Sequence, residues 1–229
     1  MRRLQDRHKK ESEMIAENLQ QILKELPSEI KLVAVSKFHP AELVMEAYEA
    51  GQRAFGESRP QEFEAKVRQL PKDIEWHFIG HLQTNKLKMV LPYAELVESV
   101  DSKHLLDAID EWGKRNGKRI NVLLEVHIGA EETKQGFHEE EILEILFDAE
   151  NYGNINFCGL MGMASHTDDE SVIDADFERI DSMMAYFVET FPELSSFRQL
   201  SIGMSGDWHI ALRHGSTILR IGTAIFGKR

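Results

Sequence analysis

Lys37 stands where a short apolar run ends, and this position could give its amine an unusual chemistry. Residues 31–36 read KLVAVS, which is typical of a buried strand. An amine at the mouth of such a strand can keep an apolar environment, and desolvation of an amine lowers its pKa. A neutral amine attacks carbonyls to form Schiff bases, so Lys37 is a candidate for covalent attachment of an aldehyde. The alternative is a lysine that ends a strand and points into water, as most lysines do.

Two glycine-containing turns near the carboxyl end of the sequence have the composition of a phosphate site. Residues 200–206 read LSIGMSG and residues 220–224 read RIGTA, and each segment follows or closes an apolar run. Free backbone N–H groups at a turn or helix start bind phosphate, and glycine lets the ligand approach the backbone. Ordinary turn residues and N-caps are the alternative interpretation of both segments.

Arg220 lies two residues before Gly222 and should therefore point to the same side of the chain. A buried arginine beside a phosphate site can bind the phosphate itself or face a ring nitrogen. It can also be a strand-end arginine paired with a surface carboxylate. His81, at the end of another predicted strand, is a further candidate for the pocket wall.

Strands and helices alternate along the chain, and they must position these residues. An amphipathic helix comes first, with apolar residues from Met14 to Leu26, and Pro27 ends it. Predicted strands follow at residues 32–35, 53–55, 75–79, 96–100, 120–128, 157–163, 199–202 and 217–221. Predicted helices lie between them at residues 41–50, 60–70, 85–90, 103–116, 139–151 and 171–191, with a short interval at 206–213.

This alternation predicts an α/β fold, a (β/α)₈ TIM-type barrel with an extra N-terminal helix, as one domain over residues 1–229. A doubly wound open sheet is the alternative. In a barrel the first and last strands are neighbours, and the carboxyl ends of all strands share one face. Lys37 and the two late turns would then meet on one ligand with an aldehyde at one end and a phosphate at the other. Pyridoxal 5′-phosphate (PLP), the vitamin B6 cofactor, has this chemistry.

Composition restricts the partners. The 229 residues carry 27 Lys and Arg against 39 Asp and Glu, a net charge of −12, which argues against nucleic-acid and anionic-membrane binding. No apolar stretch is long enough to span a membrane, and no secretory signal follows the basic N-terminus, so we expect a cytoplasmic protein.

Cys158, the single cysteine, is expected to be a small core residue. His77 and His81 have a helical zinc spacing but flank a predicted strand end, so no metal site is expected.

Several stretches resemble one family. They are AVSK at 34–37, FGE at 55–57, WHFIGHLQTNK at 76–86, SVDS at 99–102, GLM at 159–161, SIGMS at 201–205 and RIGTAIFG at 220–227. These stretches resemble the pyridoxal phosphate homeostasis proteins, which are related to the N-terminal barrel of alanine racemase. The resemblance covers most of the chain, and the stretches at 76–86 and 220–227 are together highly specific.

The resemblance implies roles for individual residues. Lys37 would form the internal Schiff base with PLP, and Arg220 would face the pyridine nitrogen. Met204 would lie against the cofactor, and the residues holding its phosphate would be Ser205, Gly222 and Thr223. The family usually has asparagine where this chain has Ser58, so any contact made by that asparagine is replaced by a shorter hydroxyl.

The resemblance also implies a binding protein without catalytic residues, one that regulates the PLP pool and with it amino-acid and keto-acid balance. PLP-dependent apoenzymes are then possible recipients. An arginine cannot accept the ring proton, which disfavours carbanion chemistry. The barrel motif runs to Arg229, so we expect no second domain of the kind that supplies a tyrosine base in alanine racemases, and the tyrosines fall in or beside predicted helices. A PLP-dependent racemase or related lyase, and a phosphosugar-binding barrel, are the alternatives.

Overall fold

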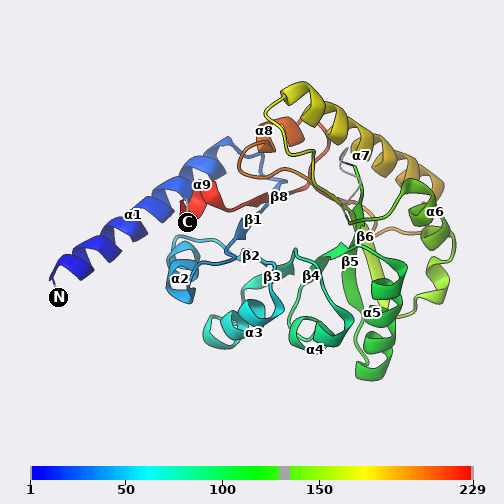
Figure 1. The fold of residues 1–229 in the computed structure, drawn as a ribbon, viewed down its shortest axis with the longest axis horizontal. Helices are drawn as coiled ribbons and strands as arrows, with labels where there is room; N and C mark the ends of the chain where they lie inside the picture. Colours follow the sequence, from blue (N-terminus) through cyan, green and yellow to red (C-terminus); the bar gives the residue numbers. More distant parts are fainter. Residues whose placement is uncertain (1, 129–134, 228–229) are drawn as a thin grey trace.

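The computed structural model describes residues 2–128 and 135–227, with side chains from residue 14 onward. Its strands form a closed barrel in sequence order, and each neighbouring pair is parallel (Figure 1). The strands are β1 (Lys31–Val35), β2 (Ala54–Glu57), β3 (Glu75–Phe78), β4 (Leu96–Val100), β5 (Ile120–Val126), β6 (Ile155–Gly162), β7 (Gln199–Ser201) and β8 (Ile218–Ile221). Closure is made by β1 and β8, where Val33 pairs with Arg220. The predicted barrel is confirmed, and the open sheet is excluded.

Helices follow the strands and cover the outside of the barrel (Figure 1). They are α1 (Arg2–Glu25), α2 (Ala41–Glu49), α3 (Pro60–Gln69), α4 (Leu87–Val90), α5 (Lys103–Asn116), α6 (Glu139–Phe147), α7 (Glu170–Thr190), α8 (Trp208–Ala211) and α9 (Thr223–Phe226). Two predicted helices are divided. A 3₁₀ turn at Thr84–Lys86 precedes α4, and another at Ala149–Asn151 follows α6 after its C-cap residue, Asp148.

The N-terminal helix α1 is confirmed, and it packs beside α2 and α9 (Figure 1). Ile15, Leu19 and Ile22 are buried on its inner face. Asn18 Nδ2 donates a hydrogen bond to the carbonyl of Ile225 in α9 at 3.0 Å. The first helix of the chain is therefore tied to the segment that follows the last strand.

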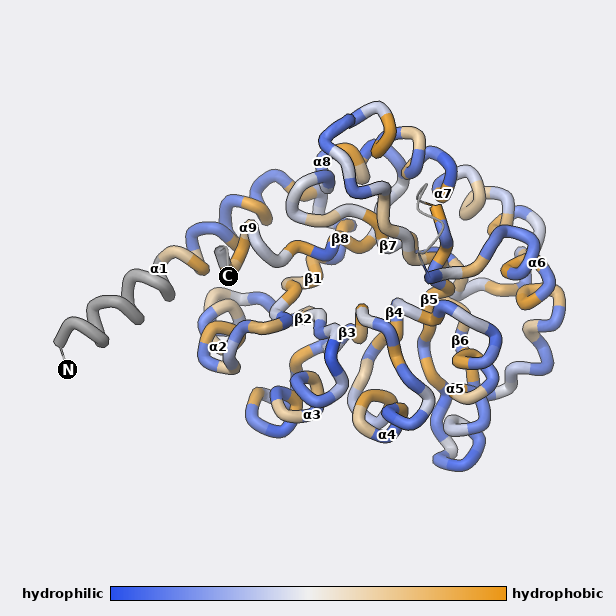
Figure 2. The backbone as a smooth tube through the Cα atoms, viewed as in Figure 1, coloured by the Kyte–Doolittle hydropathy of each residue, from blue (hydrophilic) through white to orange (hydrophobic). Residues whose placement is uncertain are grey.

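The apolar core has two layers, as in other barrels of this kind. The larger layer lies between the strands and the helices, and the smaller fills the barrel interior. The interior residues are Val33, Ala54, Leu96, Leu123, Cys158, Met161 and Ile218. Figure 2 shows hydrophobic residues along β5, β6 and β8 and mainly hydrophilic residues in α5. Cys158 is the buried core residue that the sequence predicted, and burial raises its pKa to about 11.

A bulge in β6 sets which residues face the interior. Leu123 of β5 pairs with Gly159, whereas Val122 pairs with Phe157, so the register skips Cys158. Side chains alternate along a regular strand, yet Cys158 and Met161 both lie in the interior layer. The unpaired residue at the bulge shifts the alternation by one position, so the side chain of Met161 faces the interior as Cys158 does. Gly159 has φ +146°, and a Cβ there would lie 1.8 Å from the Gln199 carbonyl oxygen, so only glycine fits.

In the part of the chain that the structure describes, no helix is both long and apolar enough to cross a membrane.

Candidate functional site

A cavity of about 240 Å³ opens at the carboxyl ends of β1, β6, β7 and β8. Its lining residues are Val35, Lys37, His39, Ile79, Met161, Met163, Met204, Ser205, Gly206, Arg220, Gly222 and Thr223. Lys37 and the two late turns, distant in sequence, therefore line the same cavity. The sequence predicted this convergence from the closure of the barrel.

The turn that carries Lys37 is held from the side by α3. The next residue, Phe38, has φ 67°, a left-handed conformation that is uncommon for residues other than glycine. The backbone N–H of Phe38 donates to Glu62 Oε2 at 2.9 Å, and the Arg59 guanidinium lies 4.1 Å from the centre of the Phe38 ring. These contacts with the first turn of α3 favour one backbone path for the residue that follows Lys37.

A buried polar cluster fixes the residue before Lys37. Ser36 Oγ donates to Glu57 Oε1 at 2.7 Å, and the Lys66 amine donates to the same oxygen and to the Ser36 carbonyl, the latter at 2.8 Å. Burial raises the pKa of Glu57, although the nearby Lys66 amine opposes this. The cluster joins β1, β2 and α3, and it was missed in the sequence because Lys66 reads as a surface helix residue.

The turns after β7 and β8 meet through Ser205. Its hydroxyl oxygen accepts hydrogen bonds from the backbone N–H groups of Gly222 at 3.2 Å and Ala224 at 3.3 Å. Ser205, Gly222 and Thr223 all line the cavity, and the hydroxyls of Ser205 and Thr223 are donors at its wall. The donor set fits a phosphate group.

Arg220 is buried in the barrel interior, which excludes the alternative of a pair with a surface carboxylate. Its guanidinium donates to the Ser201 carbonyl at 2.7 Å, to Ser201 Oγ at 2.6 Å and to the Gly162 carbonyl at 2.9 Å. Glu98 Oε2 lies 3.8 Å from it. Arg220 thus presents a fixed, charged donor group at the inner wall of the cavity.

Two predicted site residues, Ser58 and His81, are not among the lining residues of this cavity. His81 is half exposed, and its Nδ1 lies 2.7 Å from Asp101 Oδ2. Ser58 packs so closely under Gly80 that a Cβ at Gly80 would lie 2.2 Å from the Ser58 carbonyl oxygen. Within the described residues, no cluster of His, Cys, Asp and Glu could hold a metal ion.

Three buried residues of the barrel interior were not anticipated as parts of the site: His77, Glu98 and Glu125. Burial, with help from Asp101, raises the pKa of Glu125 to about 7, although Arg220 opposes the shift. Glu98 and Glu125 each interrupt a mainly apolar strand. A charged residue in such a strand was the sequence signal that could have indicated a buried carboxyl.

Comparison with known proteins identifies the family. The sequence matches the family model described as alanine racemase, N-terminal domain, over residues 11–229. It is 36% identical to the pyridoxal phosphate homeostasis protein of Pasteurella multocida, covering 94% of each chain. It is also 36% identical to the human protein of that name, over 94% of this chain and 84% of the human one. The chain belongs to the pyridoxal phosphate homeostasis protein family.

Solved structures agree with this family assignment. PipY of Synechococcus elongatus, solved without PLP, superposes with a TM-score of 0.88 at 34% identity, covering 93% of this chain and all of PipY. PipY has also been solved with PLP bound, and that structure gives a TM-score of 0.86. The alanine racemase of Clostridium difficile, at 15% identity and a TM-score of 0.76 over 57% of its own chain, shares the barrel fold with this homeostasis protein family.

Proposed function

We propose that this chain binds PLP in the cavity and holds it as a Schiff base on Lys37. The observation that carries the proposal is one cavity with an amine, a phosphate-type donor set and a guanidinium on its walls. PLP offers the matching aldehyde, phosphate and pyridine nitrogen. Apolar Val35, Ile79 and Met161 complete the walls and suit an aromatic ring. PipY, 34% identical, has been solved with PLP bound, which supports the same ligand here.

The proposed roles follow the positions of the lining residues. Ser205, Gly222 and Thr223 hold the phosphate, Arg220 faces the pyridine nitrogen, and Met204, exposed at the cavity edge, lies against the ring. PLP supplies an electrophilic carbonyl and an electron-withdrawing ring. A guanidinium cannot accept the ring proton, so Arg220 leaves the nitrogen unprotonated and the ring a weak electron sink. Contacts of Ser58 and His81 with the cofactor stay a prediction.

The biological role we propose is reversible storage of PLP rather than catalysis. The curated relatives carry the name pyridoxal phosphate homeostasis protein, which supports this role. In this proposal the chain acts as a single barrel domain, hands PLP to apoenzymes and so influences amino-acid and keto-acid balance. The cytoplasmic location stays a prediction from the sequence.

An absorbance spectrum tests PLP binding. Purified protein incubated with PLP should show a visible Schiff-base band that borohydride removes by fixing the cofactor to the chain, and mass spectrometry should place the adduct on Lys37. The Lys37→Ala variant should lack the band and the adduct. A colourless wild-type protein, or an unchanged band in Lys37→Ala, would refute the proposal.

A PLP-dependent racemase or lyase is the second candidate, and His39 is the observation that favours it. Among the described lining residues, His39 is the one histidine, and no tyrosine lines the cavity. Its ring stacks on Phe226 at 5.0 Å. Racemisation and deamination of an amino-acid panel by the loaded protein decide between the candidates. Turnover at ordinary enzymatic rates that is lost in His39→Ala would establish the enzyme and exclude a purely storage role.

A further inference from the structure

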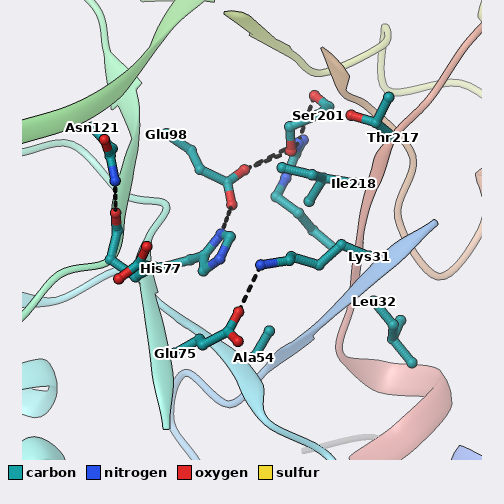
Figure 3. Close-up of polar contacts among 12 residues, drawn as sticks. Lys31, Leu32, Ala54, Glu75, His77, Glu98, Asn121, Ser201, Thr217 and Ile218 are labelled. Atoms are coloured by element: carbon teal, nitrogen blue, oxygen red, sulfur yellow. Dashed lines mark hydrogen bonds and ion pairs between the residues drawn. The ribbon is translucent and has the colours of Figure 1, made fainter. Parts of the chain in front are cut away.

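A chain of buried polar side chains extends from Arg220 across the barrel interior. Arg220 of β8 contacts Ser201 of β7, and Ser201 Oγ donates to Glu98 Oε2 of β4 at 2.5 Å. The other carboxylate oxygen, Glu98 Oε1, lies 2.5 Å from His77 Nδ1 of β3. Figure 3 shows Glu98 between His77 and Ser201. These four side chains are at most 3% exposed, so solvent does not replace any of their contacts.

The hydrogen bonds of this chain have a single direction. A carboxylate accepts only and a guanidinium donates only, so Ser201 must accept from Arg220 and donate to Glu98. His77 must likewise donate from Nδ1 to Glu98. The Ser201 hydroxyl proton therefore points to Glu98, which leaves the Ser201 oxygen free to accept from Arg220 beside the carbonyls of Ser201 and Gly162.

Glu98 also supplies the charge that makes this burial of Arg220 tolerable. An unpaired buried guanidinium is strongly unfavourable. Burial opposes ionisation of Glu98, but the hydrogen bond and charge of His77, with Arg220 and Ser201, outweigh it and hold the pKa of Glu98 below its ordinary value. The other carboxyls acting on Arg220 are Glu125 of β5 and Asp207 before α8, and burial raises the pKa of both. Glu98 is therefore the main counter-charge.

We propose that Glu98, held by His77 and Ser201, is a positioning residue. It orients the Arg220 guanidinium and offsets the positive charge that this guanidinium presents to the bound cofactor. This inference rests on the proposed function. The cofactor then faces an ion pair instead of an isolated cation. Removing the carboxylate charge makes the cavity more positive, and a more positive cavity disfavours the protonated, cationic Schiff base on Lys37.

Titration of the visible absorbance of PLP-loaded protein measures this effect, using Glu98→Gln and Ser201→Ala. The midpoint pH at which the Schiff base loses its proton should fall by roughly one pH unit in Glu98→Gln, the size expected for loss of one charge across such a cavity. Ser201→Ala should shift it in the same direction by less, because the carboxylate remains but its link to Arg220 is lost.

Two matched controls separate positioning from general damage. Asp110→Asn makes the same carboxyl-to-amide change in α5, where Asp110 accepts from the Asn154 backbone N–H. Ser216→Ala removes another buried hydroxyl, one bonded to the carbonyls of Ile202 and Ile218. Both controls should titrate like the wild type even if they are less stable.

The outcomes distinguish this inference from the proposed function. A wild-type protein without a cofactor band refutes both. A wild-type band with both test variants titrating like their controls refutes only the positioning role of Glu98. If Glu98→Gln does not fold, Ser201→Ala decides alone: a lowered midpoint supports the proposal, and a midpoint equal to that of Ser216→Ala overturns it.

Discussion

Buried carboxyls in this barrel differ in protonation because their partners differ. Glu98 receives hydrogen bonds from His77 and Ser201, and these hold its pKa low despite burial. Glu57 is also fully buried, but burial outweighs its Lys66 partner and raises its pKa. Glu125 has no hydrogen bond or ion pair to its carboxyl among the described residues, and its pKa rises to about 7. Glu57 and Glu98 each accept two hydrogen bonds, but both donors of Glu57 meet one oxygen and leave Oε2 without a partner, whereas both oxygens of Glu98 are paired and Arg220 adds a nearby positive charge.

Glu125 should make stability depend on pH. Its pKa is raised to about 7 in the folded protein, so folding is favoured most when the group is protonated. That contribution is complete below the unfolded pKa near 4.5 and is lost as pH rises toward 7. Glu125→Gln mimics the neutral form and does not ionise. The unfolding free energy of the variant minus that of the wild type should therefore increase from pH 5 to pH 8, by up to about 3 kcal/mol.

Urea denaturation at the two pH values checks this, with exposed Glu140→Gln as the control. A stability difference between Glu125→Gln and wild type that is the same at pH 5 and pH 8 would contradict the prediction.

At the scale of elements, the β6 bulge connects the fold to the site. Gly159 shifts the alternation of β6 so that Met161 faces the interior and lines the cavity. The Gly162 carbonyl, three residues beyond, accepts from Arg220. A change at Gly159 is therefore expected to affect both the packing of β6 on β7 and the position of Arg220.

Gly159→Ala should be strongly destabilising. The new Cβ would meet the Gln199 carbonyl oxygen at 1.8 Å, and the φ of +146° is unfavourable for alanine. We expect a loss of about 2–4 kcal/mol in unfolding free energy, measured by urea denaturation. Gly153→Ala is the matched control, because nothing lies within 4 Å of a Cβ there. Equal stabilities of the two variants would show that β6 tolerates a regular register.

For the whole molecule, barrel closure makes one ligand contact the first and last strands. Lys37 follows β1, whereas Ser205 and Thr223 follow β7 and β8. A ligand that joins these segments binds the folded chain alone and should stabilise it by mass action. PLP at about 100 times its dissociation constant should add about 2.7 kcal/mol, and raise the melting temperature by about 5–10 °C.

Calorimetry with PLP and with pyridoxal, which lacks the phosphate, checks this expectation. Pyridoxal at the same concentration should give a smaller shift, because it leaves the donors around Ser205 and Thr223 without an anion. Equal shifts for the two compounds would contradict a phosphate site at these turns.

The alternation of apolar runs and helical patterns was sufficient to predict the barrel, its N-terminal helix and the shared face of Lys37 and the late turns. These features depend on local periodicity and on a general property of parallel barrels, so they are readable from the sequence. The helix boundaries near residues 84–90 and 147–151 were less accurate, because short 3₁₀ turns have no periodic signature.

Tertiary structure alone decided the surroundings of these residues. His77 contacts Glu98, and Glu98 is linked through Ser201 to Arg220, only because four strands close around one interior. No sequence spacing relates these residues. The same holds for Lys66, which reads as a surface lysine but is buried against Glu57. Local sequence determines which elements form and where their ends lie. Charge pairing and protonation depend on burial and on distant neighbours, and these exist only once the chain has folded.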